Sequence, residues 1–522
     1  MGRRVFALLL LAGLLVAACG SSPSGGQGSG PKKGGTLTVA IGIDPDTLDP
    51  QAQTTTTASQ IVLMMVETLV KINTQGQIVP GLATKWQAAA NGLSYTFTLR
   101  QGVQFSDGES FDAQAVVTSL DRVNSATTYK AQPGVLTDIS NIVAVDADHV
   151  RVDLKTPFAP ILPALTQATS GILAPKSLTQ DHNSLATVVD PIGTGPYMLT
   201  DRLKSDHMTL ARNPHYWGPA PNYATQIYKV VPEDASRESL VKAGQAQVAA
   251  LPPANDLPAL RNDSSVKVIM GQSDRSIFVN IDTQDPHLPQ LQNPKVLQAM
   301  NYAVNKQAII KSVLFGAGSE ATAPVSPSLF GYCQTGPYAY EPSKAKQMLQ
   351  QAGAEGLTLR MGSPQGRYIE DYNAAQAVAG DLRAVGLNVQ LGNPPDWPTY
   401  IATTDVPAAQ EPYDISLAGW APPYLDASEG LVPFQKANWP PVGSNGSWYT
   451  DPKTEASVLS GNAGLSTTQR KTDYCTALKQ IWQDAPWIFL HYQKAPLITT
   501  TAVTGVTTLP NEQFNTVYAS PA

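Results

Sequence analysis

A change of hydrophobic period within residues 92–123 constrains the fold more than any other feature of the sequence. Residues 92–100 (GLSYTFTLR) alternate apolar and polar side chains, which is typical of a strand with one buried face. A turn is expected at Asp107-Gly108, and Asp112 is a good N-cap. Apolar residues then recur at helical spacing, as Val116, Val117, Leu120 and Val123. A strand followed so soon by a helix predicts an α/β chain.

The later half of the chain repeats this alternation with longer helices. Asn293 caps an expected helix whose first position is proline, and a second helix is expected from Ser343 to Gly353. A third helix ends at Gly386, after which residues 387–391 (LNVQL) continue as a strand. The predicted fold class is therefore α/β, with mixed sheets flanked by helices.

The N-terminus predicts export. Arg3 and Arg4 precede an apolar run over residues 5–16, which is shorter than the about 20 residues of a membrane span. Residues 16–19 (VAAC) resemble the bacterial lipobox, in which the cysteine at the cleavage site receives lipid. We expect a signal peptide over residues 1–18 and a lipid anchor on Cys19, with an ordinary cleaved signal as the alternative. One lipidated cysteine would hold the protein on the extracytoplasmic face of the cell membrane.

Residues 19–35 follow as an expected flexible tether, since Gly, Ser, Pro and Lys dominate them. Charged residues make up only 15% of the chain, against about 25% in an average soluble domain. The 35 Lys and Arg face 41 Asp and Glu, and no basic stripe occurs. Nucleic acid is excluded as a partner, because binding phosphates requires clustered basic residues.

Cys333 and Cys475 are the two other cysteines. An even pair in an oxidising compartment usually forms a disulfide, with two free buried thiols as the alternative. Two distant thiols supply too few ligands for a metal ion, and the six histidines lack ligand spacing, so no metal site is expected.

Catalytic motifs are missing from the sequence. It contains no Gly-x-Ser-x-Gly elbow, no His-Glu-x-x-His and no P-loop. Residues 193–195 (GTG) lack the third glycine of a dinucleotide fingerprint and are interpreted as a turn. We therefore expect neither an enzyme nor a cofactor.

Several longer motifs resemble one protein family. They include residues 81–86 (GLATKW), 92–108 (GLSYTFTLRQGVQFSDG), 112–120 (DAQAVVTSL), 191–197 (PIGTGPY), 212–217 (RNPHYW) and 296–304 (VLQAMNYAV). These motifs are similar to those of the solute-binding lipoproteins of the peptide, dipeptide and nickel class of ABC importers, family 5 of the bacterial extracellular solute-binding proteins. The resemblance covers nearly all of the chain from Gly34 onward.

The resemblance implies a two-lobed, periplasmic-binding-protein-like fold with an extra inserted domain. Lobe I would comprise residues 36–70, 192–278 and 494–522, the inserted subdomain residues 71–191, and lobe II residues 279–493. A short peptide or related solute would bind between the lobes, which would close about a hinge. The other implied partners are ABC permease and ATPase subunits, and the protein itself is expected to be a monomer.

The segment that contacts ligand in peptide-binding relatives resembles residues 413–426 (YDISLAGWAPPYLD) here. Those relatives place an aspartate three residues after the tryptophan, where it pairs with the α-ammonium group of the ligand. This chain has Pro423 at that position, and proline offers neither a carboxylate nor an N–H group. Asp426 would substitute if the loop were displaced; alternatively it is a turn aspartate without ligand contact.

Other candidate binding residues follow from the same resemblance. Arg367 lies near the position at which some dipeptide binders hold the ligand carboxylate, a role that suits a guanidinium group, although a solvated or structural arginine is the alternative. Trp420, Trp397 and Tyr424 resemble the aromatic lining of side-chain pockets, with core packing as the alternative.

Three functions compete at this point. The first is an importer receptor for short peptides. The second keeps the fold but binds an oligosaccharide, a metal chelate or haem, and Pro423 motivates it. The third, an enzyme or adhesion protein on the same scaffold, is weakened by the missing nucleophile constellation and the lack of repeats.

Overall fold

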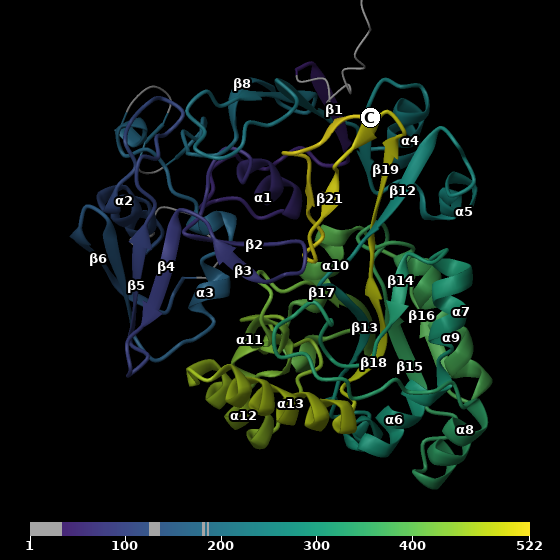
Figure 1. Cartoon of the computed structure of the whole chain (residues 1–522). Coiled ribbons are helices and arrows are strands. Elements are labelled where there is room, and N and C mark those ends of the chain that lie inside the picture. The colour runs from purple at the N-terminus through teal and green to yellow at the C-terminus, as the bar shows by residue number, and fades with distance from the viewer. Residues whose placement is uncertain (1–33, 125–135, 180–182, 185–186) are drawn as a thin grey trace, which may run out of the picture.

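The computed structural model describes residues 34–124, 136–179, 183–184 and 187–522, and Figure 1 shows its elements. The predicted signal peptide, Cys19 and nearly all of the predicted tether lie outside the described residues. Within the described part, none of the helices combines the length and the apolar character that crossing a bilayer requires. The fold is mixed α/β, as the sequence predicts.

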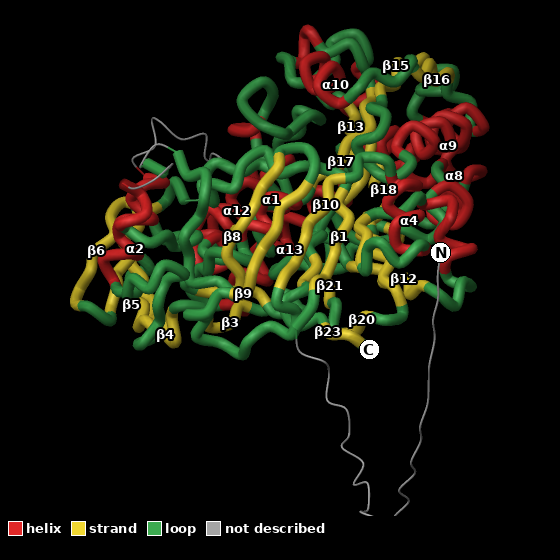
Figure 2. Tube along the Cα trace, turned by 90° about the horizontal axis from the view of Figure 1, so that it is seen from above, coloured by secondary structure: helices red, strands yellow, loops and turns green. Residues whose placement is uncertain are grey.

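The first of three larger sheets in the described residues has seven strands. Parallel pairing of β1 with β10 and β11 forms its centre, and antiparallel strands complete both edges. Figure 2 shows β8, β9, β10 and β1 running side by side. Together with its helices we call this unit the seven-stranded body. Its elements are β12 (Val266–Gly271), β19 (Ala495–Thr500), β11 (Val248–Ala250), β1 (Thr36–Ile41), β10 (Thr225–Val230), β9 (His207–Arg212), β8 (Tyr197–Leu203), α1 (Thr56–Val62), α4 (Asp234–Lys242) and α5 (Leu257–Leu260).

The six-stranded body occupies the lower right of Figure 1 and holds the largest apolar core. Its helices flank the sheet and pack on one another. The strands, in sheet order, are β14 (Gly318–Glu320), β18 (Trp487–Gln493), β13 (Ser276–Ile281), β17 (Ile415–Trp420), β15 (Thr358–Gly362) and β16 (Asn388–Leu391). The helices are α6 (Pro294–Ala303), α7 (Lys306–Ala308), α8 (Pro342–Gln351), α9 (Asp371–Ala384), α10 (Trp397–Thr404), α11 (Ala427–Gly430), α12 (Pro452–Ala463) and α13 (Thr467–Asp484).

The four-stranded body contains the segment whose period changes. It comprises β4 (Ala83–Ala88), β5 (Ser94–Leu99), β7 (His149–Leu154), β6 (Ile139–Asp146), α2 (Ala113–Asn124) and α3 (Ile161–Ala164). Short pairs complete the described strands: β2 (Val70–Ile72) with β3 (Ile78–Pro80), β20 (Val503–Thr504) with β23 (Ser520–Pro521), and β21 (Thr507–Thr508) with β22 (Phe514–Asn515).

Local sequence signals match these elements closely. Tyr95, Phe97 and Leu99 are buried on one face of β5, but Leu93, which we expect on the same face, is 38% exposed because it lies in the turn before the strand. The Asp112 carboxylate accepts a hydrogen bond from the Ala115 backbone N–H at 3.0 Å, as expected of an N-cap. The glycines of residues 193–195 pass so close to the backbone of residues 64–66 that a Cβ atom on either would lie within 2.5 Å of a carbonyl oxygen. Close chain packing, rather than phosphate binding, explains them.

Two connections cross between the seven-stranded and six-stranded bodies. Residues 272–275 lead from β12 to β13, and Lys494 joins β18 to β19. In Figure 1 the yellow strands β18 and β19 can be followed from the lower into the upper part of the molecule. The first crossing ends at Ser276, before the start of lobe II that we expect at residue 279.

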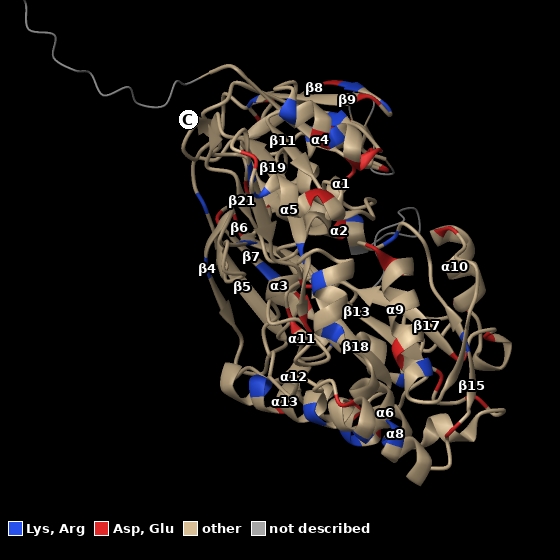
Figure 3. Ribbon diagram, turned by 90° about the vertical axis from the view of Figure 1, so that its right-hand side faces the viewer, with Lys and Arg blue, Asp and Glu red and all other residues tan. Residues whose placement is uncertain are grey.

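The six-stranded body also touches the four-stranded body. The Ala159 backbone N–H donates to the Asn462 carbonyl oxygen at 2.8 Å, and the Tyr424 side chain belongs to the apolar core of the four-stranded body. Charged residues are scattered along the ribbon, without a large field of one sign in the view of Figure 3.

Candidate functional site

A cavity of about 250 Å³ lies between α1, β2 and the C-terminal segment 509–518. Leucine, methionine, isoleucine and phenylalanine side chains make up its apolar wall. Its polar wall carries the Glu67–Lys71 ion pair and several neutral side chains, among them Gln60, Thr166, Gln167, Tyr216, Asn511 and Gln513. Among the described residues, none of the six-stranded body lines this cavity. Amides and hydroxyls both donate and accept hydrogen bonds, so this wall suits a ligand rich in peptide-like groups.

The folded chain holds these amides in place but does not use all of them. The Gln60 Oε1 atom accepts from the Phe514 backbone N–H at 3.1 Å, which fixes the C-terminal segment against α1. The Asn511 Oδ1 atom is buried and has no hydrogen-bond partner among the described residues. Burial raises the pKa of Tyr216 well above its ordinary value, so its phenol is neutral. A buried acceptor without a partner costs free energy that a ligand N–H group would recover.

Glu512 connects this cavity to the first crossing between the two bodies. It lies between Asn511 and Gln513, and its carboxylate accepts from the Arg275 Nε and Nη2 atoms at 2.8 and 2.7 Å. Burial alone would raise the pKa of Glu512, but the Arg275 guanidinium lowers it below its ordinary value. The pair therefore stays ionised and ties the cavity wall to the crossing segment.

Arg367 and Trp397 come together on the six-stranded body, next to that pair. The Arg367 guanidinium carbon lies 5.0 Å from the Trp397 ring centre and 5.3 Å from that of Tyr368. The Arg275 guanidinium carbon lies 5.8 Å from the centre of the Tyr368 ring, so Arg275 adjoins the same cluster. Burial and the Arg275 charge lower the pKa of Arg367, although its side chain is exposed to water. Arg367 is thus accessible to water and at the same time crowded by a second cation and two aromatic rings.

Trp420 adjoins the same cluster at the end of β17. The Gly419 backbone N–H donates to the Tyr368 hydroxyl at 3.0 Å, so Tyr368 links Arg367 to the segment carrying Trp420. The Trp420 Nε1 atom donates to the Glu429 carbonyl oxygen at 2.8 Å. Its ring lines a narrow crevice together with Asp274 and Pro422.

Tyr424 and Asp426, expected in the cleft, lie in a different environment. Asp426 is 1% exposed, caps α11 through the Ser428 N–H at 3.0 Å, and accepts from the Arg470 Nη2 atom at 2.7 Å. Tyr424 is also 1% exposed and donates its hydroxyl to Glu429 at 3.0 Å. The structure thus brings Arg367, Trp397 and Trp420 together and leaves Tyr424 and Asp426 inside the packed contact with the four-stranded body.

Several site residues escape sequence reasoning. Arg275 and Glu512 are 237 positions apart, and only folding brings them together. Gln60 and Gln513 carry no local signal, since surface glutamines are common in this sequence. Of these residues, Tyr368 could most easily have been found from the sequence, because it directly follows Arg367.

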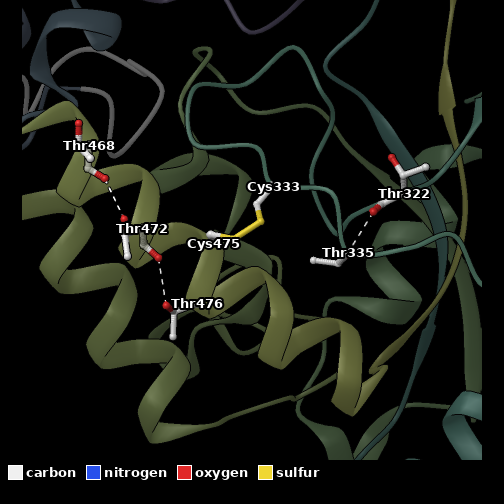
Figure 4. Close-up of a disulfide and its surroundings, with 7 residues drawn as sticks. All are labelled: Thr322, Cys333, Thr335, Thr468, Thr472, Cys475 and Thr476. Carbon is white, nitrogen blue, oxygen red and sulfur yellow. Dashed lines mark hydrogen bonds between the residues drawn. A yellow bond between two sulfur atoms is a disulfide. The ribbon is translucent and has the colours of Figure 1, made fainter.

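Cys333 and Cys475 form a disulfide in the structure, with Cα atoms 5.2 Å apart. Figure 4 shows it joining a loop to α13, one residue after Tyr474, whose hydroxyl contacts Arg470. It therefore braces the packed region around Asp426 rather than the cavity. Elsewhere in the described part of the chain, no group of three or more His, Cys, Asp or Glu side chains is placed to hold a metal ion.

Comparisons with known proteins agree with this architecture. The profile of the bacterial extracellular solute-binding proteins, family 5 Middle, matches residues 77–440. The glutathione-binding protein GsiB of Pectobacterium atrosepticum is 28% identical over 487 residues, covering 91% of this chain and 92% of the relative.

Solved structures show the same fold with different ligands. DppA from Helicobacter pylori in complex with peptide STSA has a TM-score of 0.76 at 24% identity, covering 94% of this chain and 98% of that one. NikA from Brucella suis in complex with Fe(III)-EDTA has a TM-score of 0.82 at 24% identity, covering 94% and 100%.

Fold and cleft define an extracytoplasmic solute receptor. The chain belongs to family 5 of the bacterial extracellular solute-binding proteins. It is the substrate-binding protein of an ABC importer and not an enzyme. The permease that receives the solute is the partner this family implies.

Proposed function

We propose that the protein captures short peptides in the cleft between the seven-stranded and six-stranded bodies and delivers them to the permease. The observation that carries this proposal is Arg367, which is exposed to water on the six-stranded body, beside the crossing residue Arg275, and has no carboxylate within salt-bridge distance among the described residues. A terminal carboxylate of a peptide suits such a guanidinium. The relative named for glutathione, itself a small peptide, supports the same ligand class.

Closure about the two crossings is the proposed mechanism. The seven-stranded body corresponds to lobe I, the four-stranded body to the inserted subdomain and the six-stranded body to lobe II. In the described part of the chain, only residues 272–275 and the link at Lys494 cross between lobes I and II, so small backbone rotations there would open the cleft. The Arg275–Glu512 pair would hold the closed form at the point where the crossing meets the cavity.

A direct test is native mass spectrometry of the purified protein with a pool of dipeptides to pentapeptides. The proposal expects retained peptides, and it expects Trp420→Ala to retain fewer while unfolding at a similar denaturant concentration. A protein that retains no peptide and is not thermally stabilised by the pool at millimolar concentration would contradict the peptide assignment.

A second candidate is a non-peptide solute such as an oligosaccharide, a metal chelate or haem. Pro423 favours it, because the position lacks the carboxylate used by typical peptide binders. The structure with Fe(III)-EDTA shows that this fold accommodates a chelate. A non-peptide mass carried from the producing cell would support this candidate over the first.

We also propose that lipid on Cys19 anchors the receptor to the membrane. The sequence of residues 1–35 supports this proposal. Replacing Cys19 with serine should move the protein from the membrane fraction to the soluble extracytoplasmic fraction, as measured by immunoblotting.

A further inference from the structure

The cavity between α1, β2 and the C-terminal segment 509–518 has no part in the proposed solute cleft. Figure 1 shows α1 and β2 beside β21 in the upper part of the molecule. None of Arg367, Trp397 and Trp420 is among the described residues that line the cavity. Its described lining comes from residues 60–72, 166–167, 196, 216 and 509–518, so its walls all lie on the same side of the two crossings between the bodies.

The size of the cavity suits a small organic molecule. Its volume is about 250 Å³. An apolar cavity of about 150 Å³ is large enough to bind benzene, whereas pockets for drug-sized ligands begin at about 300 Å³. The cavity therefore has room for a benzene-sized body with one polar group attached to it.

The apolar wall is held in place by the core of the seven-stranded body. Met64, Phe514 and Val517 line the cavity and also belong to that core, and Leu63 packs against it. These side chains come from the end of α1 and from the C-terminal segment, which the core packs together. An apolar body placed against them would be removed from water, which favours binding.

Two buried glutamines on the polar wall have hydrogen-bonding groups that the fold does not use. Gln60 and Gln513 are each 7% exposed, and both line the cavity. The Phe514 backbone N–H donates to the Gln60 Oε1 atom at 3.1 Å, which fixes the direction of that amide and leaves its Nε2 atom as a donor. Neither the Gln60 Nε2 atom nor the Gln513 amide group has a hydrogen-bond partner among the described residues. A ligand amide would supply the missing partners.

The wall carries no net charge. Glu67 and Lys71 pair with each other, and Glu67 also accepts from the Trp217 Nε1 atom at 2.7 Å and the Thr194 hydroxyl at 2.8 Å. Burial raises the pKa of Tyr216, so its phenol is neutral. No other Asp, Glu, Lys or Arg of the described residues lines the cavity. A charged ligand would lose its hydration here without gaining a counter-charge.

We infer that this cavity is a second binding site, separate from the solute cleft, for small neutral molecules that join an apolar body to a carboxamide group. The Gln60 Nε2 atom donates to the carbonyl oxygen of the ligand. Gln513, whose amide is not fixed by an internal hydrogen bond, turns its Oε1 atom to accept the ligand N–H group. The apolar body packs against Met64, Phe514 and Val517.

Benzamide is the probe that tests this inference. Its binding to the intact protein is measured by calorimetry beside that of benzoate, an anion of the same shape, and of N,N-dimethylbenzamide, which has no N–H group. Benzamide is expected to bind with a Kd of about 1 mM or lower, and each of the other two at least about tenfold more weakly. Absence of saturable benzamide binding at about 10 mM, or equal binding of benzoate, would overturn the inference.

A matched pair of variants tests the role of the amide. Gln513→Leu keeps a similar volume and removes no internal side-chain hydrogen bond, so it should fold normally and bind benzamide about tenfold more weakly. Gln390→Leu makes the same change at an exposed position on β16 and should leave benzamide binding unchanged. Equal affinities of the two variants would remove Gln513 from the site and contradict the binding mode.

The place of binding is tested by hydrogen–deuterium exchange with benzamide at saturation. Slower exchange is expected in residues 60–72 and 509–518. Protection confined to residues 413–426 would put benzamide in the solute cleft and overturn the inference. The experiment needs no peptide, so a failure of the proposed peptide function and a failure of this second site are observed separately.

Discussion

Two arginines of the six-stranded body lie against aromatic rings, but one of them is buried and the other is exposed. Arg470 is 6% exposed, lies 4.5 Å from the Phe330 ring, and donates to Asp426 and to the Gly461 carbonyl oxygen. Arg367 is exposed, lies 5.0 Å from the Trp397 ring, and has no carboxylate within salt-bridge distance among the described residues. The pKa values shift in opposite directions: burial would lower that of Arg470, but Asp426 raises it, whereas burial and Arg275 both lower that of Arg367.

This difference separates an arginine whose role is structural from one that we propose binds the ligand. The charge of Arg470 is fully compensated within the fold, so its contribution is to stability. Arg367 has no salt-bridge partner among the described residues and lies near the Arg275 charge, so under the proposed function a ligand anion would stabilise it. Each of the following predictions tests one side of this comparison.

The largest expected effect is on the Arg470 side. Asp426→Ala leaves the Arg470 guanidinium buried without its partner and removes the α11 cap, so the free energy of unfolding should fall by about 3–5 kcal/mol. Asp396→Ala removes a cap of the same residue type at an exposed site and should cost about 1 kcal/mol. Urea denaturation measures both, and equal losses would show that the buried pair has no special role.

The next effect concerns Glu429, which lies in the same packed region. Burial raises the pKa of Glu429 to about 7, above its unfolded value near 4.5. The folded state therefore binds the proton more tightly, and this stabilisation is complete below pH 4.5 and is lost as the pH rises through 7.

Glu429→Gln should remove this dependence. Between pH 4.5 and 8 the wild type should lose up to about 3 kcal/mol more stability than the variant. Denaturation of both proteins at pH 5 and pH 8 gives the difference. Parallel stability changes in the two proteins would contradict the assignment of the titration to Glu429.

On the Arg367 side the effect should appear in binding instead of stability. Arg367→Ala should weaken binding of a carboxylate-bearing peptide about 10- to 100-fold, or about 1.4–2.7 kcal/mol, with the free energy of unfolding nearly unchanged. Arg151→Ala, at a half-buried arginine on the four-stranded sheet, is the control and should alter neither quantity appreciably. Destabilisation by Arg367→Ala to the extent seen with Asp426→Ala would place both arginines in one structural class.

The smallest effect comes from the aromatic partners. Trp397→Leu removes the ring beside Arg367 and should weaken binding by about 2- to 5-fold, whereas Phe330→Leu removes the ring beside Arg470 and should lower stability by about 0.5–1 kcal/mol. Calorimetry with a retained peptide measures binding, and urea denaturation measures stability. Applied to both variants, they should show that Trp397→Leu weakens binding and that Phe330→Leu lowers stability.

Much of the fold could be read from the sequence because its signals are local. The alternation over residues 92–100, the cap at Asp112 and the proline after Asn293 each specify backbone conformation within a few residues. The family motifs extended these elements to a whole architecture. Leu93 shows the limit, since its exposure depends on where the strand begins.

The site was less accessible to sequence reasoning. Arg367, Trp397 and Trp420 were named by resemblance. The structure places Arg367 against the Trp397 ring, and Trp420 follows Gly419, whose N–H donates to Tyr368. Tyr424 and Asp426 carried the same kind of motif evidence, yet the fold buries them against Arg470 and Glu429. A motif records which residues occur together in the chain, and it does not record which of their polar atoms are already hydrogen-bonded.

The sequence by itself determined the α/β class, the absence of catalytic motifs and the family, because these depend on residue types and short spacings. Only the tertiary structure decided which charges are free. Glu512 pairs with Arg275 across 237 positions, and Asp426 pairs with Arg470, while Arg367 has no salt-bridge partner among the described residues. Whether a charge stabilises the fold or binds a ligand depends on its partners and its access to water, and both are set by contacts between distant parts of the chain.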